Sequence, residues 1–152
     1  MIKIICVGKI KEKYINDGIN EYLKRLSAFE KIEIVEVKEY NNKDIETNIS
    51  LEGKEILSKI NEKDYCITLE ILGKNIDSIS FAYLLNDLKC HKSTNISLII
   101  GGSNGLSNEV KERSNCALSF SNMTFPHQLM RLILLEQVYR AYTILNNKEY
   151  HK

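Results

Sequence analysis

Most of the side chains that could take part in chemistry lie in two segments near the end of the chain and in its last three residues. The first segment, residues 101–105, follows an apolar run and is rich in glycine, so a ligand could approach its backbone closely. The second, residues 119–127, is polar and ends in Pro126 and His127. The chain closes on Tyr150-His151-Lys152. Together these segments are typical of a small α/β protein that binds a nucleotide-like ligand at the ends of adjacent strands.

Each of the two loops, taken alone, has a simpler interpretation. In the first, only Gly102 and Gly105 have a spacing that fits part of the dinucleotide fingerprint, and the lysine of a P-loop is missing. A tight turn without a ligand therefore fits residues 101–105 as well as a binding loop does. Residues 120–125 either bind the edge of a purine through their backbone or simply connect two elements.

The charged and titratable residues near the end of the chain are similarly open to two interpretations. A histidine beside a tyrosine is suited to proton transfer near neutral pH, whereas a chain end is often solvated and frayed. Arg131 and Arg140 interrupt an apolar helix and need a partner, either Glu136, four residues before Arg140, or an anionic ligand. His127 could cap the helix or pack against it, and His91 is typical of a surface position.

Strand-like apolar runs alternate with segments of helical spacing, which predicts parallel strands joined by crossover helices. We expect a break near Gly53, a loop at Gly73, an N-cap at Ser107 and a helix whose first turn holds Pro126. Residues 1–152 are then one three-layer α/β domain. The expected strands span 2–7, 32–37, 65–69, 96–100 and 117–120, and the expected helices span 15–26, 45–60, 79–88, 107–113 and 126–145.

The final helix has more apolar positions than one stripe on a sheet requires. From Leu129 to Leu135 only Arg131 is polar, and apolar residues continue to Leu145. Such a helix should bury two faces, which favours a two-fold homodimer interface over a central helix buried within one subunit.

Composition limits the partners and the compartment. The chain has 152 residues with 21 basic and 20 acidic side chains, so a polyanionic partner must be met by a local patch, a tail or a patch doubled in an oligomer. Lys9, Lys11 and Lys13 are a candidate patch, although a solvated loop explains them too.

The four cysteines have no metal-ligand spacing and suit a reducing compartment. The short apolar start is neither a signal peptide nor a membrane span, so we expect a cytoplasmic protein without a metal or a membrane partner.

Several segments together resemble one known family over the whole chain. They are residues 4–9 (IICVGK), 69–74 (LEILGK), 100–106 (IGGSNGL), 118–127 (LSFSNMTFPH) and the closing YHK. This combination resembles the RlmH family, the large-subunit ribosomal RNA pseudouridine N3-methyltransferases. Glu70 stands where the family often has Asp, and Phe125 where it often has Leu, a change that could reshape the adenine pocket.

The resemblance implies a SPOUT-type fold with a C-terminal trefoil knot, which the residue patterns alone do not predict because knots are rare. It implies a homodimer that uses S-adenosylmethionine. By position, the cofactor would be held through backbone groups and apolar contacts by Leu69, Gly101, Gly102, Phe120, Ser121, Asn122, Met123, Thr124 and Phe125.

The substrate implied by the resemblance is pseudouridine 1915 in helix 69 of 23S ribosomal RNA, within the assembled 70S ribosome. Direct methyl transfer to N3 requires loss of the N3 proton. We expect Tyr150 or His151 to act as the base or to orient the target, in its own subunit or across the dimer. Arg140 or Lys152 would stabilise the developing negative charge. Two rivals are a SPOUT methyltransferase for transfer RNA or another position, and a non-enzymatic ribosome-binding dimer with the same fold.

Overall fold

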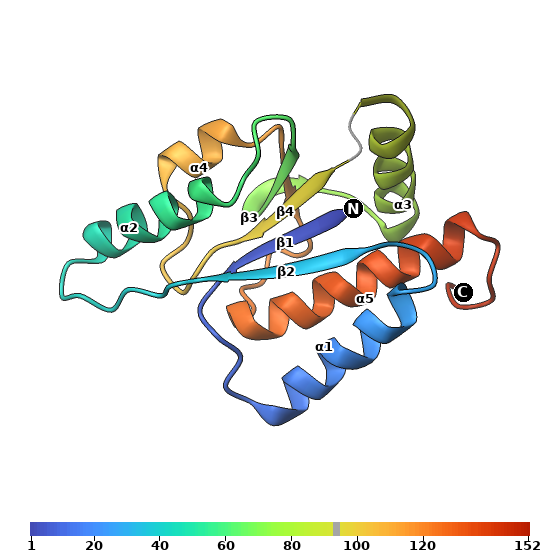
Figure 1. Cartoon of the computed structure of the whole chain (residues 1–152), viewed down its shortest axis with the longest axis horizontal. Helices are drawn as coiled ribbons and strands as arrows, with labels where there is room; N and C mark the ends of the chain where they lie inside the picture. The colour runs from blue at the N-terminus through green and yellow to red at the C-terminus, as the bar shows by residue number, and fades with distance from the viewer. Residues whose placement is uncertain (93–94) are drawn as a thin grey trace.

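The strands and helices alternate along the chain, as the sequence pattern predicts (Figure 1). The computed structural model describes residues 1–92 and 95–152. A short π-helical turn, Leu88–Lys92, follows the third helix. The strands are β1 (Ile2–Val7), β2 (Ile32–Val37), β3 (Tyr65–Asn75), β4 (Ile96–Ile100) and β5 (Cys116–Ser119), and the helices are α1 (Lys13–Leu26), α2 (Ile45–Ser58), α3 (Ser78–Asp87), α4 (Asn108–Arg113) and α5 (His127–Leu145).

The five strands form one sheet in the order β2-β1-β4-β3-β5, and every neighbouring pair is parallel. In β1, Ile2, Ile4 and Cys6 face one hydrophobic core, whereas Ile5 and Val7 face another. The sheet is thus buried on both faces, which explains why its central strands are almost continuously apolar. Because all strands run the same way, their carboxyl ends meet at one edge, where ligands of open α/β sheets bind.

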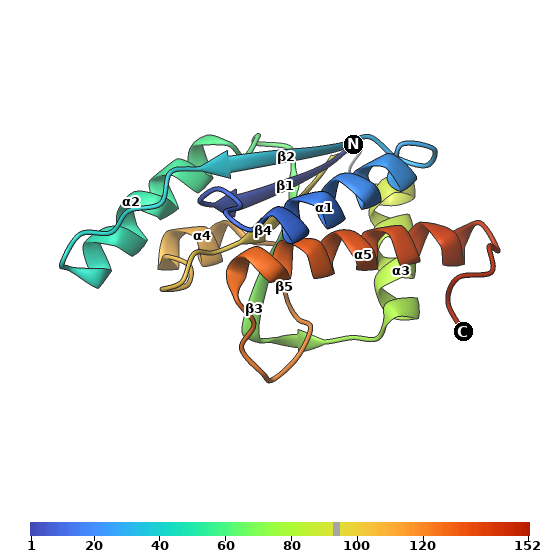
Figure 2. The same ribbon diagram turned by 90° about the horizontal axis from the view of Figure 1, so that it is seen from below.

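Helices cover both faces of the sheet. In Figures 1 and 2, α1 and α5 lie on one side and α2 and α4 on the other. Helix α3 contributes Phe81, Ala82 and Leu85 to the same core as α1 and α5. The expected α/β class with parallel strands and three layers is therefore confirmed.

Local capping explains where several helices begin. The Ser107 hydroxyl accepts a hydrogen bond from the Val110 N–H at 3.3 Å, which confirms this residue as the N-cap of α4. Asp44 and Asp77 cap α2 and α3 in the same way. Pro126 is the N-cap of α5 rather than part of its first turn, and its carbonyl accepts from the Met130 N–H at 2.9 Å.

Two glycines lie inside regular elements, contrary to the sequence-based expectation. Helix α2 continues through Gly53 without a break, and a glycine fits there because an ideal Cβ would lie 2.2 Å from the Ser107 Oγ. Gly73 is not in a loop but within β3, which extends beyond Leu69 to Asn75 after a register shift against β5.

Helix α5 has few exposed positions because it packs against α1 and α3 as well as on the sheet. Part of its apolar surface is therefore buried within one subunit. None of residues 127–145 is fully exposed, yet Leu129, Leu132 and Ile133 remain only half-buried. The expected homodimer interface on this helix stays a prediction.

Candidate active site

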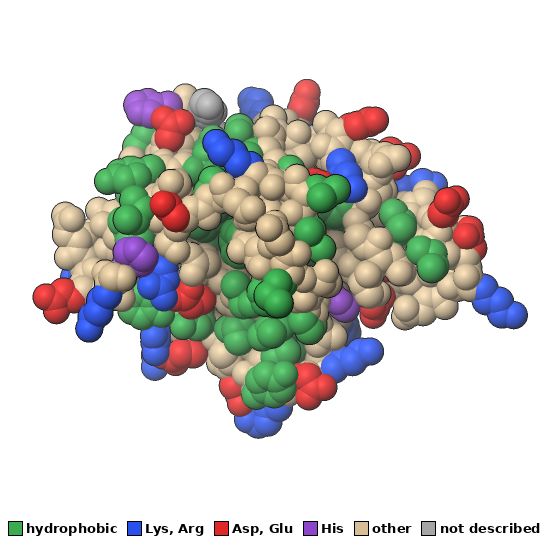
Figure 3. All heavy atoms as spheres, turned by 180° about the vertical axis from the view of Figure 1, so that it is seen from behind, with side chains coloured by type: hydrophobic (Ala, Val, Ile, Leu, Met, Phe, Trp, Pro, Cys, Tyr) green, Lys and Arg blue, Asp and Glu red, His purple; other side chains and the backbone are tan. Residues whose placement is uncertain are grey.

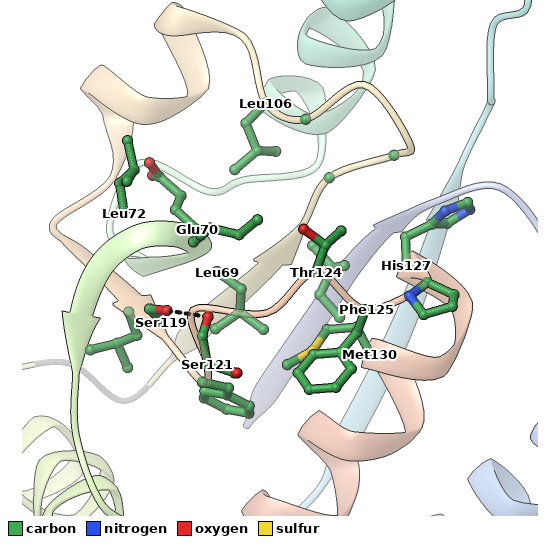
Figure 4. A pocket seen from close by; sticks show the side chains of 18 of the residues that line it. Leu69, Glu70, Leu72, Leu106, Ser119, Ser121, Thr124, Phe125, His127 and Met130 are labelled. Atoms are coloured by element: carbon green, nitrogen blue, oxygen red, sulfur yellow. Dashed lines mark hydrogen bonds between the residues drawn. The ribbon is translucent and has the colours of Figure 1, made fainter.

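A cavity of about 690 Å³ lies at the carboxyl edge of the sheet. Three stretches of chain surround it: residues 69–72 of β3, residues 100–106 from the last residue of β4 onward, and residues 118–127 from the end of β5 to the first residue of α5. Figure 4 shows the side chains of Leu69, Leu106, Thr124, Phe125 and Met130 arranged around this space. The volume falls in the range of small-molecule sites, and the lining is mainly apolar.

The extension of β3 forms one wall of the cavity. The register against β5 shifts between Leu69 and Lys74, so residues 70–73 bulge out of the ladder. Gly73 returns the strand to β5 so closely that a Cβ there would lie 2.6 Å from the Leu118 carbonyl carbon. Only glycine permits this approach, and the bulge therefore depends on it.

The glycine loop after β4 forms the second wall. A Cβ on Gly101 would lie 3.0 Å from the Gly105 carbonyl carbon, and one on Gly102 would lie 3.0 Å from the Glu52 Oε2. The Gly105 N–H donates to the Gly102 carbonyl at 3.1 Å, which closes a tight turn. A side chain on Gly101 would press on the loop's own backbone, whereas one on Gly102 would press on the side chains of Glu52 and Val7.

The segment from Phe120 to Pro126 forms the third wall and crosses the edge of the sheet. It begins at β5, which is an edge strand, and ends where α5 lies beside β1. Arg131 fixes that end: it is 1% exposed, its Nη1 donates to the Glu36 Oε1 at 2.6 Å, and its Nη2 donates to the Gly8 carbonyl at 3.0 Å. The segment therefore passes the carboxyl ends of β3 and β4, directly over the cavity.

Of the nine residues expected to hold a cofactor, eight line this cavity and Asn122 does not. Asn122 is exposed in the same loop. Within the loop, the Ser119 hydroxyl donates to the Ser121 carbonyl at 2.9 Å, and the Ser121 hydroxyl accepts from the Met123 N–H at 3.0 Å. Figure 4 shows the first of these two bonds. The eight lining residues are Leu69, Gly101, Gly102, Phe120, Ser121, Met123, Thr124 and Phe125.

The cavity also contains residues that the sequence reasoning did not assign to the site. Glu70 and Lys111 place opposite charges in its lining, with Nζ and Oε2 4.0 Å apart, and the Thr68 hydroxyl donates to Glu70 at 2.7 Å. His127 and Met130 enter from the first turn of α5. Met130 lies one helical turn after Pro126. This spacing was the signal in the sequence that could have identified Met130 as a lining residue.

The expected catalytic residues lie at the other end of α5. Arg140 is 13 residues after His127, or about 20 Å along the helix axis. Its guanidinium donates to Glu136, lies 4.8 Å from the centre of the Tyr150 ring, and has its Nη1 3.2 Å from the His151 Nδ1. The structure thus brings Arg140, Tyr150 and His151 together, whereas Lys152 is exposed at the end of the chain.

The tail and the cavity are connected through a smaller hollow of about 460 Å³. His151 lines this hollow, together with Asp77, Gln137 and two residues that also line the larger cavity, Phe120 and Phe125. The tail therefore lies on the far side of these two rings from the larger cavity of its own chain. No residue from 150 to 152 is part of that cavity's lining.

The Tyr150 hydroxyl is held as a hydrogen-bond donor. It lies 3.3 Å from the Tyr22 hydroxyl and 3.1 Å from the Glu136 Oε1, and its ring meets Tyr139 edge to face. Burial, followed by the bond with Tyr22 and the charge of Glu136, raises the pKa of Tyr150. In this arrangement the phenol donates to Glu136 and stays protonated at neutral pH, which suits a residue that positions its neighbours.

The stability of Glu52→Gln relative to the wild type is expected to rise with pH. Glu52 is 3% exposed beneath Gly102; its Oε1 accepts from the Tyr40 N–H at 3.0 Å and its Oε2 has no partner among the described residues. Burial raises the pKa of this carboxyl above its ordinary value of 4.5. Folding therefore favours the protonated form, and that contribution is lost as the pH rises from 4.5 through the raised pKa.

Urea unfolding of both proteins at about pH 4 and about pH 8 tests this expectation through the linkage of stability to protonation. The unfolding free energy of Glu52→Gln minus that of the wild type should be larger at about pH 8 than at about pH 4. A difference in unfolding free energy that is the same at both pH values would show that the ionisation of Glu52 does not contribute.

Metal and membrane sites are not found in the described part of the chain. Within residues 1–92 and 95–152, no three His, Cys, Asp or Glu side chains are grouped closely enough to hold a metal ion. In the same ranges, every helix is too short or too polar to cross a bilayer.

Comparisons with known proteins agree with this site. The family model described as "Predicted SPOUT methyltransferase" matches residues 1–151. The chain is 52% identical over 153 residues to a protein of Fusobacterium nucleatum named ribosomal RNA large subunit methyltransferase H, covering 99% of each. It is 50% identical over 157 residues to the protein of that name from Clostridioides difficile, again with 99% coverage of each.

Solved structures show the same fold at low sequence identity. A probable methyltransferase from Bordetella pertussis superimposes with a TM-score of 0.58 at 13% identity, covering 93% of this chain and 95% of that one. A probable methylase family protein from Haemophilus influenzae gives a TM-score of 0.56 at 13% identity, covering 99% and 70%. The cavity, the glycine loop and these matches lead to one conclusion: the chain is an enzyme that belongs to the SPOUT methyltransferase family.

Proposed function

We propose that the chain transfers a methyl group from S-adenosylmethionine to N3 of pseudouridine 1915 in helix 69 of 23S ribosomal RNA, within the assembled 70S ribosome. One observation carries the proposal: the cavity built from residues 69–72, 100–106 and 118–127, in a SPOUT chain half identical to proteins named for ribosomal RNA methylation. Residues 1–152 act as one methyltransferase domain, in the cytoplasm where ribosomes are found.

The residues of the cavity fit an S-adenosylmethionine molecule. Gly101 and Gly102 line the cavity and carry no side chain, so a ligand can reach the loop backbone at these positions. Leu69, Phe120 and Phe125 offer apolar surface for a purine ring. When bound, this cofactor supplies a methyl group already activated by a positively charged sulfur. The chain's own task is then to align the acceptor and exclude water.

The tail residues are suited to handle the proton and the charge of the acceptor. Loss of the N3 proton leaves a negative charge on the base, which a nearby cation stabilises. His151 is the candidate base, because the Tyr150 phenol has a raised pKa and Arg140 is permanently charged. Arg140 holds the His151 ring, and Lys152 is free to approach the nucleic acid.

We further propose that the enzyme is a homodimer. Figure 3 shows hydrophobic side chains gathered from the centre downwards on the face opposite that of Figure 1. Ile79, Met123 and Phe125 line the cavities and are exposed, as is Tyr83 of α3, and a second copy would cover such residues. A dimer also allows the tail of one subunit to reach the cavity of the other, since the tail does not line the cavity of its own chain.

The path of residues 120–126 supports a trefoil knot. This segment crosses from β5 past β3 and β4 to β1, while the loop after β4 lines the same cavity. Two loops that pass close to each other at one edge of the sheet in this way are the arrangement that a knot requires. The knot would hold the glycine loop and residues 120–126 together without a ligand.

Mass spectrometry of ribosomal RNA after incubation with protein and S-adenosylmethionine tests the proposed function. Unmethylated 70S ribosomes, free ribosomal RNA and transfer RNA are compared as substrates. A mass gain of one methyl group on a helix 69 fragment from ribosomes alone is expected. Methylation confined to transfer RNA, or cofactor binding without transfer to any RNA, would overturn the proposal.

A further inference from the structure

Three lysines follow β1, at the same edge of the sheet as the cavity: two on the loop after the strand and one at the first residue of α1. They are Lys9, Lys11 and Lys13, and all three are exposed. Lys13 forms an ion pair with Asp17, with its Nζ 2.5 Å from the Oδ2. Within the described part of the chain, Lys9 and Lys11 have no carboxylate within ion-pair distance. These two ammonium groups are therefore available to an anionic partner.

The loop that carries Lys9 and Lys11 is held in place on both sides. At its start, Gly8 has a φ of +78°, donates to the Val37 carbonyl at 2.9 Å, and accepts from the buried Arg131 at 3.0 Å. Between the two lysines, Ile10 packs against the main hydrophobic core. The half-buried side chain of Ile10 therefore fixes the backbone, while its exposed neighbours carry their charges into solvent.

The loop is also attached directly to the wall of the cavity. The Lys11 N–H donates to the Gln128 Oε1 at 3.1 Å. Gln128 is in the first turn of α5, next to His127, which lines the cavity. The lysine loop and the cavity thus share one structural support, so a ligand that contacts Lys9 and Lys11 is placed in a fixed relation to the cavity.

We infer that Lys9 and Lys11 bind the phosphate backbone of the RNA substrate and place it at the cavity mouth. This inference rests on the proposed function. The whole chain has a net charge of only +1, so attraction to RNA must come from local cations such as these. Phosphate contacts position a nucleic acid without reading its sequence, which suits two lysines beside a site that handles one base.

Ribosome binding by Lys9→Ala/Lys11→Ala tests the inference. Two matched arms are included: Lys24→Ala/Lys31→Ala removes the same charge from exposed positions at the opposite edge of the sheet, and Lys9→Arg/Lys11→Arg keeps the charge. Co-sedimentation with unmethylated 70S ribosomes gives the dissociation constant at several salt concentrations. Calorimetry with S-adenosylmethionine gives the cofactor affinity, and circular dichroism verifies folding.

Lys9→Ala/Lys11→Ala should weaken ribosome binding by about tenfold. It should also reduce the slope of log affinity against log salt concentration by roughly 1.5–2, because two phosphate contacts no longer release counterions. Cofactor affinity should stay unchanged in every variant, and the arginine pair should bind ribosomes like the wild type. Equal losses in the loop pair and the control pair would overturn the inference. So would a loss of affinity with an unchanged salt slope, which indicates a ribosomal protein as the contact.

The binding measurement separates this inference from the proposed function. If the wild type binds ribosomes through the lysine loop but methylates nothing, the proposed reaction fails and the inferred surface stands. If the wild type methylates ribosomes and the loop pair does so with an unchanged KM, the surface fails and the reaction stands.

Discussion

Gly73→Ala is expected to weaken S-adenosylmethionine binding by at least about tenfold, which corresponds to about 1.4 kcal/mol. The new methyl group would meet the backbone of Ala117 and Leu118 at 2.6–2.8 Å, so β3 and β5 must separate. The bulge at residues 70–72, which forms one wall of the cavity, would move with them. Overpacking of this kind should also lower the unfolding free energy by about 1–3 kcal/mol. Calorimetry and urea unfolding measure the two effects.

Lys74→Ala is the matched control for Gly73→Ala. Lys74 is the next residue in the same extension and its side chain is exposed, so truncation leaves the contact with β5 intact. This variant should bind the cofactor like the wild type. If Gly73→Ala bound equally well while folded, the β3 extension would not shape the cofactor site.

Deletion of residues 150–152 is expected to lower kcat for methyl transfer to ribosomes by roughly 10²–10⁴-fold, the usual contribution of a positioned acid–base group. The deletion removes the Tyr150 ring from Tyr139 and Arg140, and it removes the candidate base His151. Cofactor affinity should change far less than kcat, because none of the three residues lines the large cavity of its own chain. Single-turnover kinetics with ribosomes and calorimetry with S-adenosylmethionine separate the two quantities.

Point variants assign the expected loss to one residue. His151→Ala should reproduce most of the loss, whereas Tyr150→Phe keeps the ring packing and removes only the hydroxyl bonds to Tyr22 and Glu136. Mixing the truncated chain with a Gly73→Ala chain tests whether the tail acts across a dimer. The first chain has an intact cavity and the second an intact tail, so activity should return on mixing only if the tail acts on the cavity of the other subunit. If the truncated chain kept the full kcat of the wild type, the tail would have no part in methyl transfer.

The framework of the fold was predictable from hydrophobic periodicity. Strands β1, β2 and β4 match their expected bounds because continuous apolar runs specify a strand buried on both faces. The capping hydroxyl of Ser107 also gave a correct helix start. Such features depend on residues close together in the sequence, which is why one sequence suffices to identify them.

The less predictable features depend on contacts between distant residues. Gly73 looks like a loop residue in sequence, and only its contact with β5, more than 40 residues later, makes it part of a strand. The glycine loop and residues 120–125 were predicted to follow adjacent strands; they line one cavity, Asn122 excepted, but β3 lies between β4 and β5. The charged pair of Glu70 and Lys111 was missed because only the fold brings it together. The position of the tail relative to the cavity of its own chain likewise follows from the length of α5, not from a motif.

The bond between Arg131 and the Gly8 carbonyl has a consequence for how the protein is made. It joins positions 123 residues apart, and it anchors the last helix beside the first strand. During synthesis, β1 emerges early but cannot gain this contact, or its pairing with β4, until most of the chain has left the ribosome. Long-range pairing of this kind slows folding, so the nascent chain should reach its final form only after release, leaving its apolar first strand a candidate chaperone target in the interval.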